Sequence, residues 1–277
     1  MKSYLRLTEF ELGRFFKLYL TLMGLTIISQ IIGIVVVANN YMGEANRSIY
    51  EESMSKQEFL EEFGDISLLN FAQTIWFLAP IAICITALLF YIFMIWYRDW
   101  FGKNTFIYRL LMLPTARINL FFAKATAILL MVFGLVALQI ILLYIEGIIL
   151  DWIVPNEFLK EMTIHQISHS FPELGILYPP TFTEFILYYG TGLMAVFILF
   201  TAILLERSFR WKGLLLGIGY IGLTTAFFLL PVILTVMFDK TYLYPTEWLI
   251  IQSIFGIILI VISIGLSRYL LKKRITV

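Results

Sequence analysis

Apolar residues run along this chain in long unbroken stretches rather than at every second position. Six of these stretches cover residues 18–38, 72–97, 123–150, 183–205, 213–236 and 248–267. A helix of about 20 residues, rising about 1.5 Å per residue, crosses the hydrocarbon core of a bilayer. Lipid leaves the backbone few other ways to satisfy its hydrogen bonds, so the pattern predicts six transmembrane helices.

The composition supports this interpretation. Of the 277 residues, 60% are hydrophobic and 14% are charged, whereas soluble domains have about 45–50% and about 25%. We therefore predict an all-α integral membrane protein with a single domain over residues 1–277. The net charge of +1 and the lack of a large soluble domain give no reason to expect a nucleic-acid partner. The single cysteine, Cys84, excludes an internal disulfide and a cysteine-cluster metal site.

Lysine and arginine gather on one side of the predicted spans. They occupy the N-terminal tail, the segment 98–124, the link 207–212 and the C-terminus. The four that lie elsewhere are Arg47, Lys56, Lys160 and Lys240. The acids that accompany the cations are Glu9, Glu11, Asp99 and Glu206. Because cytoplasmic loops are enriched in lysine and arginine, we expect both termini in the cytoplasm and the loops at about 39–71 and 151–182 outside.

The two outer loops contain two local patterns. Ser55 and Glu58 have capping-box spacing before apolar residues, which predicts a short interfacial helix. The acidic residues of this loop also allow a docking surface for a cationic substrate or partner. In the second loop, Glu161, His165 and His169 would share one helix face, where zinc binding is an alternative to an ordinary surface helix.

Two polar residues lie within the third predicted span. Glu146 lies about one turn inside the outer end, and Gln139 precedes it by seven residues on the same helical face. Intramembrane ionisable groups tend to face a bundle interior or a wet cavity, so both residues are candidates for a translocation path. The alternative is that Glu146 reaches outward to the headgroups. In the fifth span, Gly213 and Gly217 have the small-xxx-small spacing that favours close helix packing.

No enzyme motif is found in the sequence. The chain has no G-x-x-x-x-G-K-[ST] phosphate-binding loop, no H-E-x-x-H zinc motif and no G-x-S-x-G nucleophile motif. We therefore expect no catalytic residues and no cofactor bound by this chain.

The segment FGKNTFIYRLLMLPTARINLFFAK, residues 101–124, is too charged to span a membrane and too apolar for a solvated loop. Asn104 or Thr105 can cap a short helix, and Pro114 disfavours helix at the residue before it. The pattern predicts a short cytoplasmic helix, a proline break and then the third span. Such an apolar helix must be covered, either by the headgroups and its own bundle or by a partner protein.

The same segment resembles the permease subunits of ABC exporters, the six-span ABC-2 class. These permeases carry LPxxR between the second and third spans, which corresponds here to Leu113-Pro114-Thr115-Ala116-Arg117, followed by Lys124. The N-terminal EFELGRFFKLYL is similar to their cytoplasmic amphipathic connecting helix before the first span.

The resemblance implies a permease of the plasma membrane that is coupled through segment 104–117 to a separate cytoplasmic ABC ATPase, which binds ATP and Mg. The residues expected to dock the ATPase are Phe106, Tyr108, Arg109, Leu110, Met112, Pro114 and Arg117. A second permease, identical or different, would pair with this one within the lipid bilayer. The apolar spans favour export of a hydrophobic or amphipathic cargo, such as a peptide, an antibiotic or a lipid. A membrane scaffold or sensor without transport, or a secondary transporter, are the alternatives.

Overall fold

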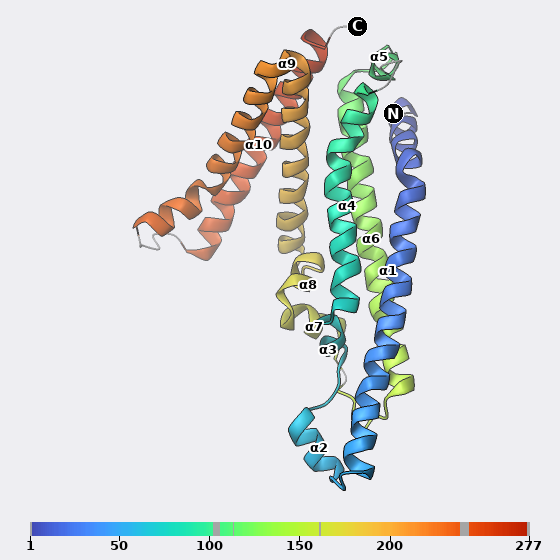
Figure 1. The fold of residues 1–277 in the computed structure, drawn as a ribbon. Coiled ribbons are helices and arrows are strands. Elements are labelled where there is room, and N and C mark those ends of the chain that lie inside the picture. The colour runs from blue at the N-terminus through green and yellow to red at the C-terminus, as the bar shows by residue number, and fades with distance from the viewer. Residues whose placement is uncertain (1, 102–105, 113, 161, 239–243, 276–277) are drawn as a thin grey trace. The chain divides into compact units, whose positions relative to one another are not determined.

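The fold is helical throughout the part of the chain that the computed structural model describes: residues 2–101, 106–112, 114–160, 162–238 and 244–275. Within these ranges there is no strand, only an isolated bridge between Ile66 and Leu159. The predicted all-α class is therefore confirmed. The helices are α1 (Lys2–Tyr50), α2 (Lys56–Phe63), α3 (Leu68–Ala72), α4 (Ile75–Trp100), α5 (Phe106–Leu111), α6 (Ile118–Ile153), α7 (Ile164–Ser170), α8 (Pro172–Leu177), α9 (Phe182–Phe238) and α10 (Pro245–Lys273) (Figure 1).

Five of the described helices are long and apolar enough to cross a membrane: α1, α4, α6, α9 and α10. This makes the chain a multi-pass membrane protein. The first helix differs from the expected separate N-terminal helix and first span, because α1 is unbroken over 49 residues. It contains no proline, and its glycines weaken a helix by only about 1 kcal/mol each.

Helix α9 contains both the fourth and the fifth predicted spans. Its 57 residues are interrupted at Arg210, whose φ of 54° and ψ of −128° are not helical, and the chain turns back on itself there (Figure 1). The two halves pack closely. A Cβ on Gly213 would lie 2.8 Å from Glu206 Cα, and one on Gly217 would lie 2.9 Å from the Ala202 carbonyl oxygen. The small-xxx-small spacing therefore marks a real close contact.

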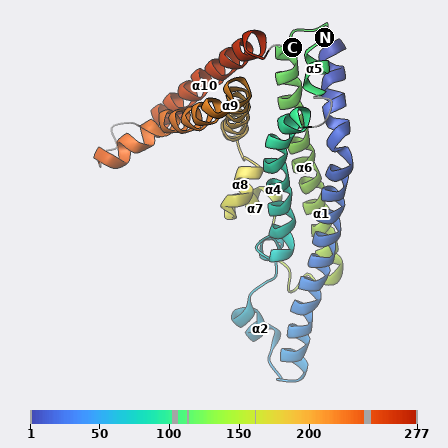
Figure 2. The same ribbon diagram turned by 45° about the horizontal axis from the view of Figure 1, so that its top comes forward.

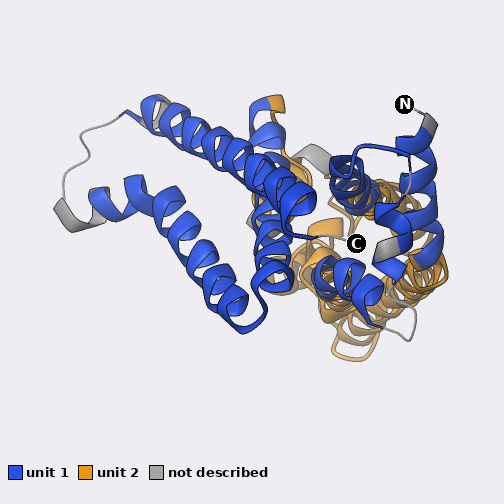
Figure 3. Cartoon of the chain, turned by 90° about the horizontal axis from the view of Figure 1, so that it is seen from above, with its two compact units in different colours: residues 1–14, 88–130, 183–277 blue, residues 15–87, 131–182 orange. Residues whose placement is uncertain are grey.

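The chain divides into two compact units (Figure 3). Unit 1 contains residues 1–14, 88–130 and 183–277, and unit 2 contains residues 15–87 and 131–182. Helices α1, α4 and α6 contribute residues to both units and run side by side (Figures 1 and 2). In unit 1 the rings of Trp96, Phe121 and Phe200 meet edge to face, with centroids 5.6 Å apart in each contact to Phe200.

Unit 2 has an apolar core built from α1, α4, α6 and the shorter helices. Its fully buried members include Ile34 and Ala38 of α1 and Phe59, Phe71 and Phe77. Helix α2 contributes Phe59 to this core and begins with the predicted capping box: the Ser55 hydroxyl accepts from the Glu58 N–H, and the Ser55 N–H donates to Glu58 at 2.8 Å. These hydrogen bonds lower the pKa of the exposed Glu58 carboxyl, because they favour its charged form.

A proline within α4 is compensated by a neighbouring helix. Pro80 has no N–H, so it cannot bond the carbonyl of Trp76, and the ring also strains the turn before it. The Ser29 hydroxyl donates to the Trp76 carbonyl at 3.4 Å, and the Gln30 amide donates to the Phe77 carbonyl at 3.2 Å. Polar side chains of α1 therefore satisfy carbonyls that the proline releases.

The second proline inside a long apolar helix also has a polar side chain of a neighbouring helix close to it. Pro231 lies in α9, and the side-chain amide of Gln252 in α10 donates to the Phe228 carbonyl at 2.9 Å. In both helices the acceptor is the carbonyl three residues before the proline. The two glutamines explain why proline is tolerated inside these apolar segments.

Close packing of α1 on the start of α4 depends on Gly33. A Cβ at this position would overlap Trp76 Cβ and lie 3.2 Å from the Phe71 ring. We predict that Gly33→Ala lowers the free energy of unfolding by about 1–3 kcal/mol. Trp76 Cβ is bonded directly to the main chain, so it cannot make room for the new methyl group unless the backbone also moves. Thermal unfolding in detergent measures the change.

Gly24 provides the matched control on the same helix, because a Cβ there has no neighbour within 4 Å. Gly24→Ala should leave the melting temperature unchanged or raise it, since alanine favours the helix. Equal melting temperatures for the two alanine variants would refute the packing argument.

Candidate functional site

Helix α5, between α4 and α6, is where the sequence predicts a docking element. One side of it is buried: Ile107 is fully covered, and Leu110 and Leu111 are 8% and 5% exposed. On the other side Arg109 is exposed, and Met112, just after the helix, is 70% exposed. The short helix is therefore attached by an apolar face and has a free edge.

The attachment involves the first turns of α1, beside which α5 lies (Figure 2). The rings of Phe10 and Phe106 stack with centroids 5.8 Å apart. The Arg14 guanidinium lies 5.1 Å from the first ring and 5.2 Å from the second. A cation held against two rings adds an electrostatic attraction to the apolar contact.

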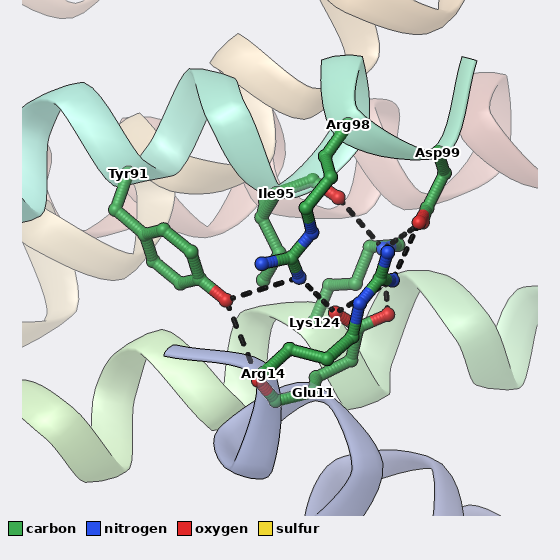
Figure 4. Close-up of polar contacts among 7 residues, drawn as sticks. All are labelled: Glu11, Arg14, Tyr91, Ile95, Arg98, Asp99 and Lys124. Carbon is green, nitrogen blue, oxygen red and sulfur yellow. Dashed lines mark hydrogen bonds and ion pairs between the residues drawn. The ribbon is translucent and has the colours of Figure 1, made fainter. Parts of the chain in front are cut away.

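Arg14 also belongs to a buried ion cluster, which we define as Glu11, Arg14, Arg98, Asp99 and Lys124 (Figure 4). Lys124 of α6 lies at its centre and is fully buried. Its Nζ donates to Glu11 Oε1 at 2.7 Å, to Asp99 Oδ2 at 2.5 Å and to the Ile95 carbonyl at 2.8 Å. An ammonium has three donors, so each of them has an acceptor.

The two carboxylates of the ion cluster are satisfied just as fully. Glu11 receives Lys124 on one oxygen and Arg98 Nη2, at 3.3 Å, on the other. Asp99 receives Lys124 on one oxygen and Arg14 Nη1, at 2.6 Å, on the other. Both carboxylates are fully buried, whereas the arginines are partly exposed. The ion cluster therefore joins α1, α4 and α6 through charge-assisted hydrogen bonds, which are stronger and more directional than neutral ones.

Arg117, the arginine of the LPxxR motif, has a different set of partners. Its Nη1 donates to the carbonyls of Leu271 and Ile275, at 2.8 Å each. These carbonyls lie at the end of α10, where the last turn leaves backbone acceptors unsatisfied. Arg117 therefore ties the start of α6 to the end of α10.

The remaining docking candidates fall into two groups. Phe106 and Leu110 belong to the attached side of α5, and Pro114 is exposed next to Met112. Tyr108 lies in α5, but its side chain is not among those the structure describes. The free edge consists of Arg109, Met112 and Pro114.

The path candidates of α6 have contrasting surroundings in unit 2. Gln139 exchanges two hydrogen bonds with Gln30, at 3.0 and 3.2 Å. Glu146 is fully buried, and neither of its carboxyl oxygens has a hydrogen-bond partner among the described residues. It does not extend to the surface, as the headgroup alternative requires.

The suggested metal ligands are not assembled on one helix. Glu161 lies outside the described residues, and α7 begins at Ile164 after an N-cap at Thr163. His165 and His169 both lie in α7. Among the described residues, no group of three His, Cys, Asp or Glu side chains is placed to hold a metal ion.

Sequence reasoning singled out Lys124 but missed its acceptors Glu11 and Asp99, and also Arg14 and Arg98, which pair with these acids. A signal was present. Glu11 and Asp99 are two of only four acids on the cation-rich side of the predicted spans, and an acid close to an apolar stretch needs a partner. What the sequence does not state is which cations those acids meet.

Comparison with known proteins adds no identity. The chain matches no family model, no curated protein and no solved structure. The functional conclusion therefore rests on the residues and their geometry.

The ion cluster makes a specific prediction about stability. Lys124→Met should lower the free energy of unfolding by about 3–5 kcal/mol, because it leaves two buried carboxylates with reduced compensation. Glu11→Gln removes the charge of one acceptor of Lys124. Its loss of unfolding free energy should add only in part to that of Lys124→Met. Thermal or denaturant unfolding in detergent measures each variant.

A double-mutant cycle distinguishes a coupled cluster from independent effects. Glu11→Gln combined with Lys124→Met should be less destabilising than the sum of the single changes, because their residues share a hydrogen bond. Arg109→Ala is the control, since its side chain is exposed. Strict additivity would show that the lysine and the glutamate act separately.

Proposed function

We propose that the chain is the transmembrane permease subunit of an ATP-driven exporter of the ABC-2 type. The LPxxR resemblance supports this, and so does one structural observation above all. A short helix between α4 and α6 is held by its buried face while Arg109, Met112 and Pro114 remain exposed. A partner that binds this edge would move a helix firmly attached to the bundle.

In this proposal the ion cluster transmits the movement. A force on α5 passes through the Phe106 and Phe10 rings to Arg14, and Arg14 bonds Asp99. From there Lys124 links α4 to α6 and to Glu11 of α1. Closely packed elements respond to a push by switching between discrete arrangements, which suits alternation between inward-open and outward-open states.

The proposed topology has six spans: α1, α4, α6, the two halves of α9 on either side of Arg210, and α10. The N- and C-termini and α5 lie in the cytoplasm, and the loops containing α2 and α7 lie outside. The cation distribution supports this orientation.

The division of labour follows from the resemblance. A separate cytoplasmic ATPase binds ATP and Mg, and this chain contributes no catalytic residue. A second permease, the same or different, completes the transporter in the plasma membrane. The cargo is hydrophobic or amphipathic, which matches the apolar character of the spans.

The topology is tested by labelling single cysteines in intact cells. In a Cys84→Ala background, Glu61→Cys in α2 should react with a membrane-impermeant maleimide added outside. Met112→Cys, beside α5, should react only after the membrane is permeabilised. Both positions are exposed. Labelling of Met112→Cys in intact cells would place α5 on the outer side and end the proposal.

Docking is tested by finding whether a neighbouring gene encodes an ABC ATPase and by co-purifying that ATPase with this chain. Arg109→Glu with Met112→Ala should reduce the recovered ATPase and its stimulation by about tenfold or more, because the change removes an interface cation and an apolar contact. Arg268→Glu, an exposed cation of α10, is the control. A wild-type complex that survives the double substitution unchanged would show that the ATPase does not bind this edge.

A further inference from the structure

Glu146 is a buried acid that takes no part in the proposed coupling through α5 and the ion cluster. It lies on α6 between Leu143 and Leu150, which are on the same helix face and belong to the apolar core of unit 2. Ile34, Ala38, Phe71 and Phe77 belong to the same core. Its two carboxyl oxygens are therefore held in apolar surroundings without a hydrogen-bond partner among the described residues.

The ion cluster shows how this chain treats an acid that has a structural role. Glu11 and Asp99 are as deeply buried as Glu146, but Glu11 pairs with three cations and Asp99 with two. An acid buried without a partner lowers stability, and such groups persist where a function requires them. The contrast indicates that Glu146 serves a partner that the described residues do not supply.

The surroundings restrict what this partner is. Divalent metal ions require several oxygen ligands, and none of the described residues form such a group around Glu146. One carboxyl group with apolar walls instead suits a single positive charge carried on an apolar body.

We propose that Glu146 binds the positively charged group of an amphipathic organic cation. That this cation is the cargo of an exporter rests on the proposed function. Its binding to Glu146 requires no ATPase. The assignment narrows the cargo from any hydrophobic molecule to one with an ammonium, amidinium or phosphonium group.

A pocket in unit 2 provides room for such a molecule next to Glu146. It has a volume of about 350 Å³, and its lining includes Gly147, Leu150 and one residue of each charge, Asp151 and Lys160. Gly147 follows Glu146 in sequence, and a Cβ at Gly147 would meet no atom within 4 Å. Leu150, one turn further on, borders both the pocket and the apolar core. Glu146 itself is buried and does not line the pocket, so the proposal requires the Leu150 side chain to move when a ligand in the pocket binds this carboxyl group.

The test compares two probes of similar size and opposite charge, tetraphenylphosphonium and tetraphenylborate. The purified full-length chain in neutral-lipid nanodiscs should bind the phosphonium saturably, with empty nanodiscs as the background. Glu146→Gln keeps the side-chain shape but removes the charge, and should weaken this binding about 10- to 100-fold, as expected for loss of a charge-assisted contact. The borate should show no binding that depends on Glu146.

Two further variants separate charge from folding. Glu146→Leu should abolish phosphonium binding while raising the melting temperature, because the apolar core then lacks an unpartnered acid. Glu62→Gln, at an exposed acid of α2 that does not line the pocket, should bind the phosphonium like the wild type.

Non-saturable phosphonium binding by the wild type, unchanged binding by Glu146→Gln, or equal loss of binding in Glu62→Gln would each overturn the assignment. Because the assay contains no ATPase, failure of ATPase docking leaves a positive result standing. Intact docking together with a negative result here refutes only the cationic cargo.

Discussion

The structure of unit 1 depends on how a single buried ammonium is satisfied. Lys124 is fully covered, and its three donors meet a carboxylate of α1, a carboxylate of α4 and a carbonyl of α4. Desolvating these charges carries a large penalty, which is offset only while the acceptors keep their positions. The three helices are therefore fixed relative to one another at this level by geometry as well as by apolar contact. Arg14 extends the same constraint to α5 through the rings of Phe10 and Phe106.

Uncharged polar side chains that are buried elsewhere in the chain are also satisfied by defined partners. Gln30 and Gln252 each donate to a backbone carbonyl three residues before a proline in a neighbouring helix. Without water, an unpaired carbonyl is costly, so the kinked helix and its glutamine must move together. The glutamines therefore link each proline-containing helix to its neighbour beside the proline. The polar side chains that appear scattered along the apolar segments thus have defined structural partners, and Glu146 stands apart from them.

Most of the fold could be predicted from the sequence, and the site only in part. Apolar length and composition predict the long helices, because burial in lipid depends on local sequence. The capping box at Ser55 and the close packing at Gly217 are equally local, and both are present. The unbroken α1 was not predicted. Without a helix-breaking residue such as proline, the sequence does not show whether a connecting helix and the following span are separate helices or one. The partners of Lys124 come from positions 25 and 113 residues away, and one sequence does not encode such pairings visibly.

The two ways in which this chain buries acids bear on its function. In unit 1 the acids neutralise lysine and arginine and produce a rigid connection next to α5. In unit 2 an acid of the same helix, α6, lies between the apolar Leu143 and Leu150 on its own face and has no hydrogen-bond partner among the described residues. A transporter needs both properties in one chain: a stiff region that accepts force, and a region whose stability improves when a ligand arrives. Because a ligand that binds one state shifts the population toward that state, a cation bound to Glu146, as proposed, would bias the conformational equilibrium of the proposed exporter in a way that apolar walls alone would not.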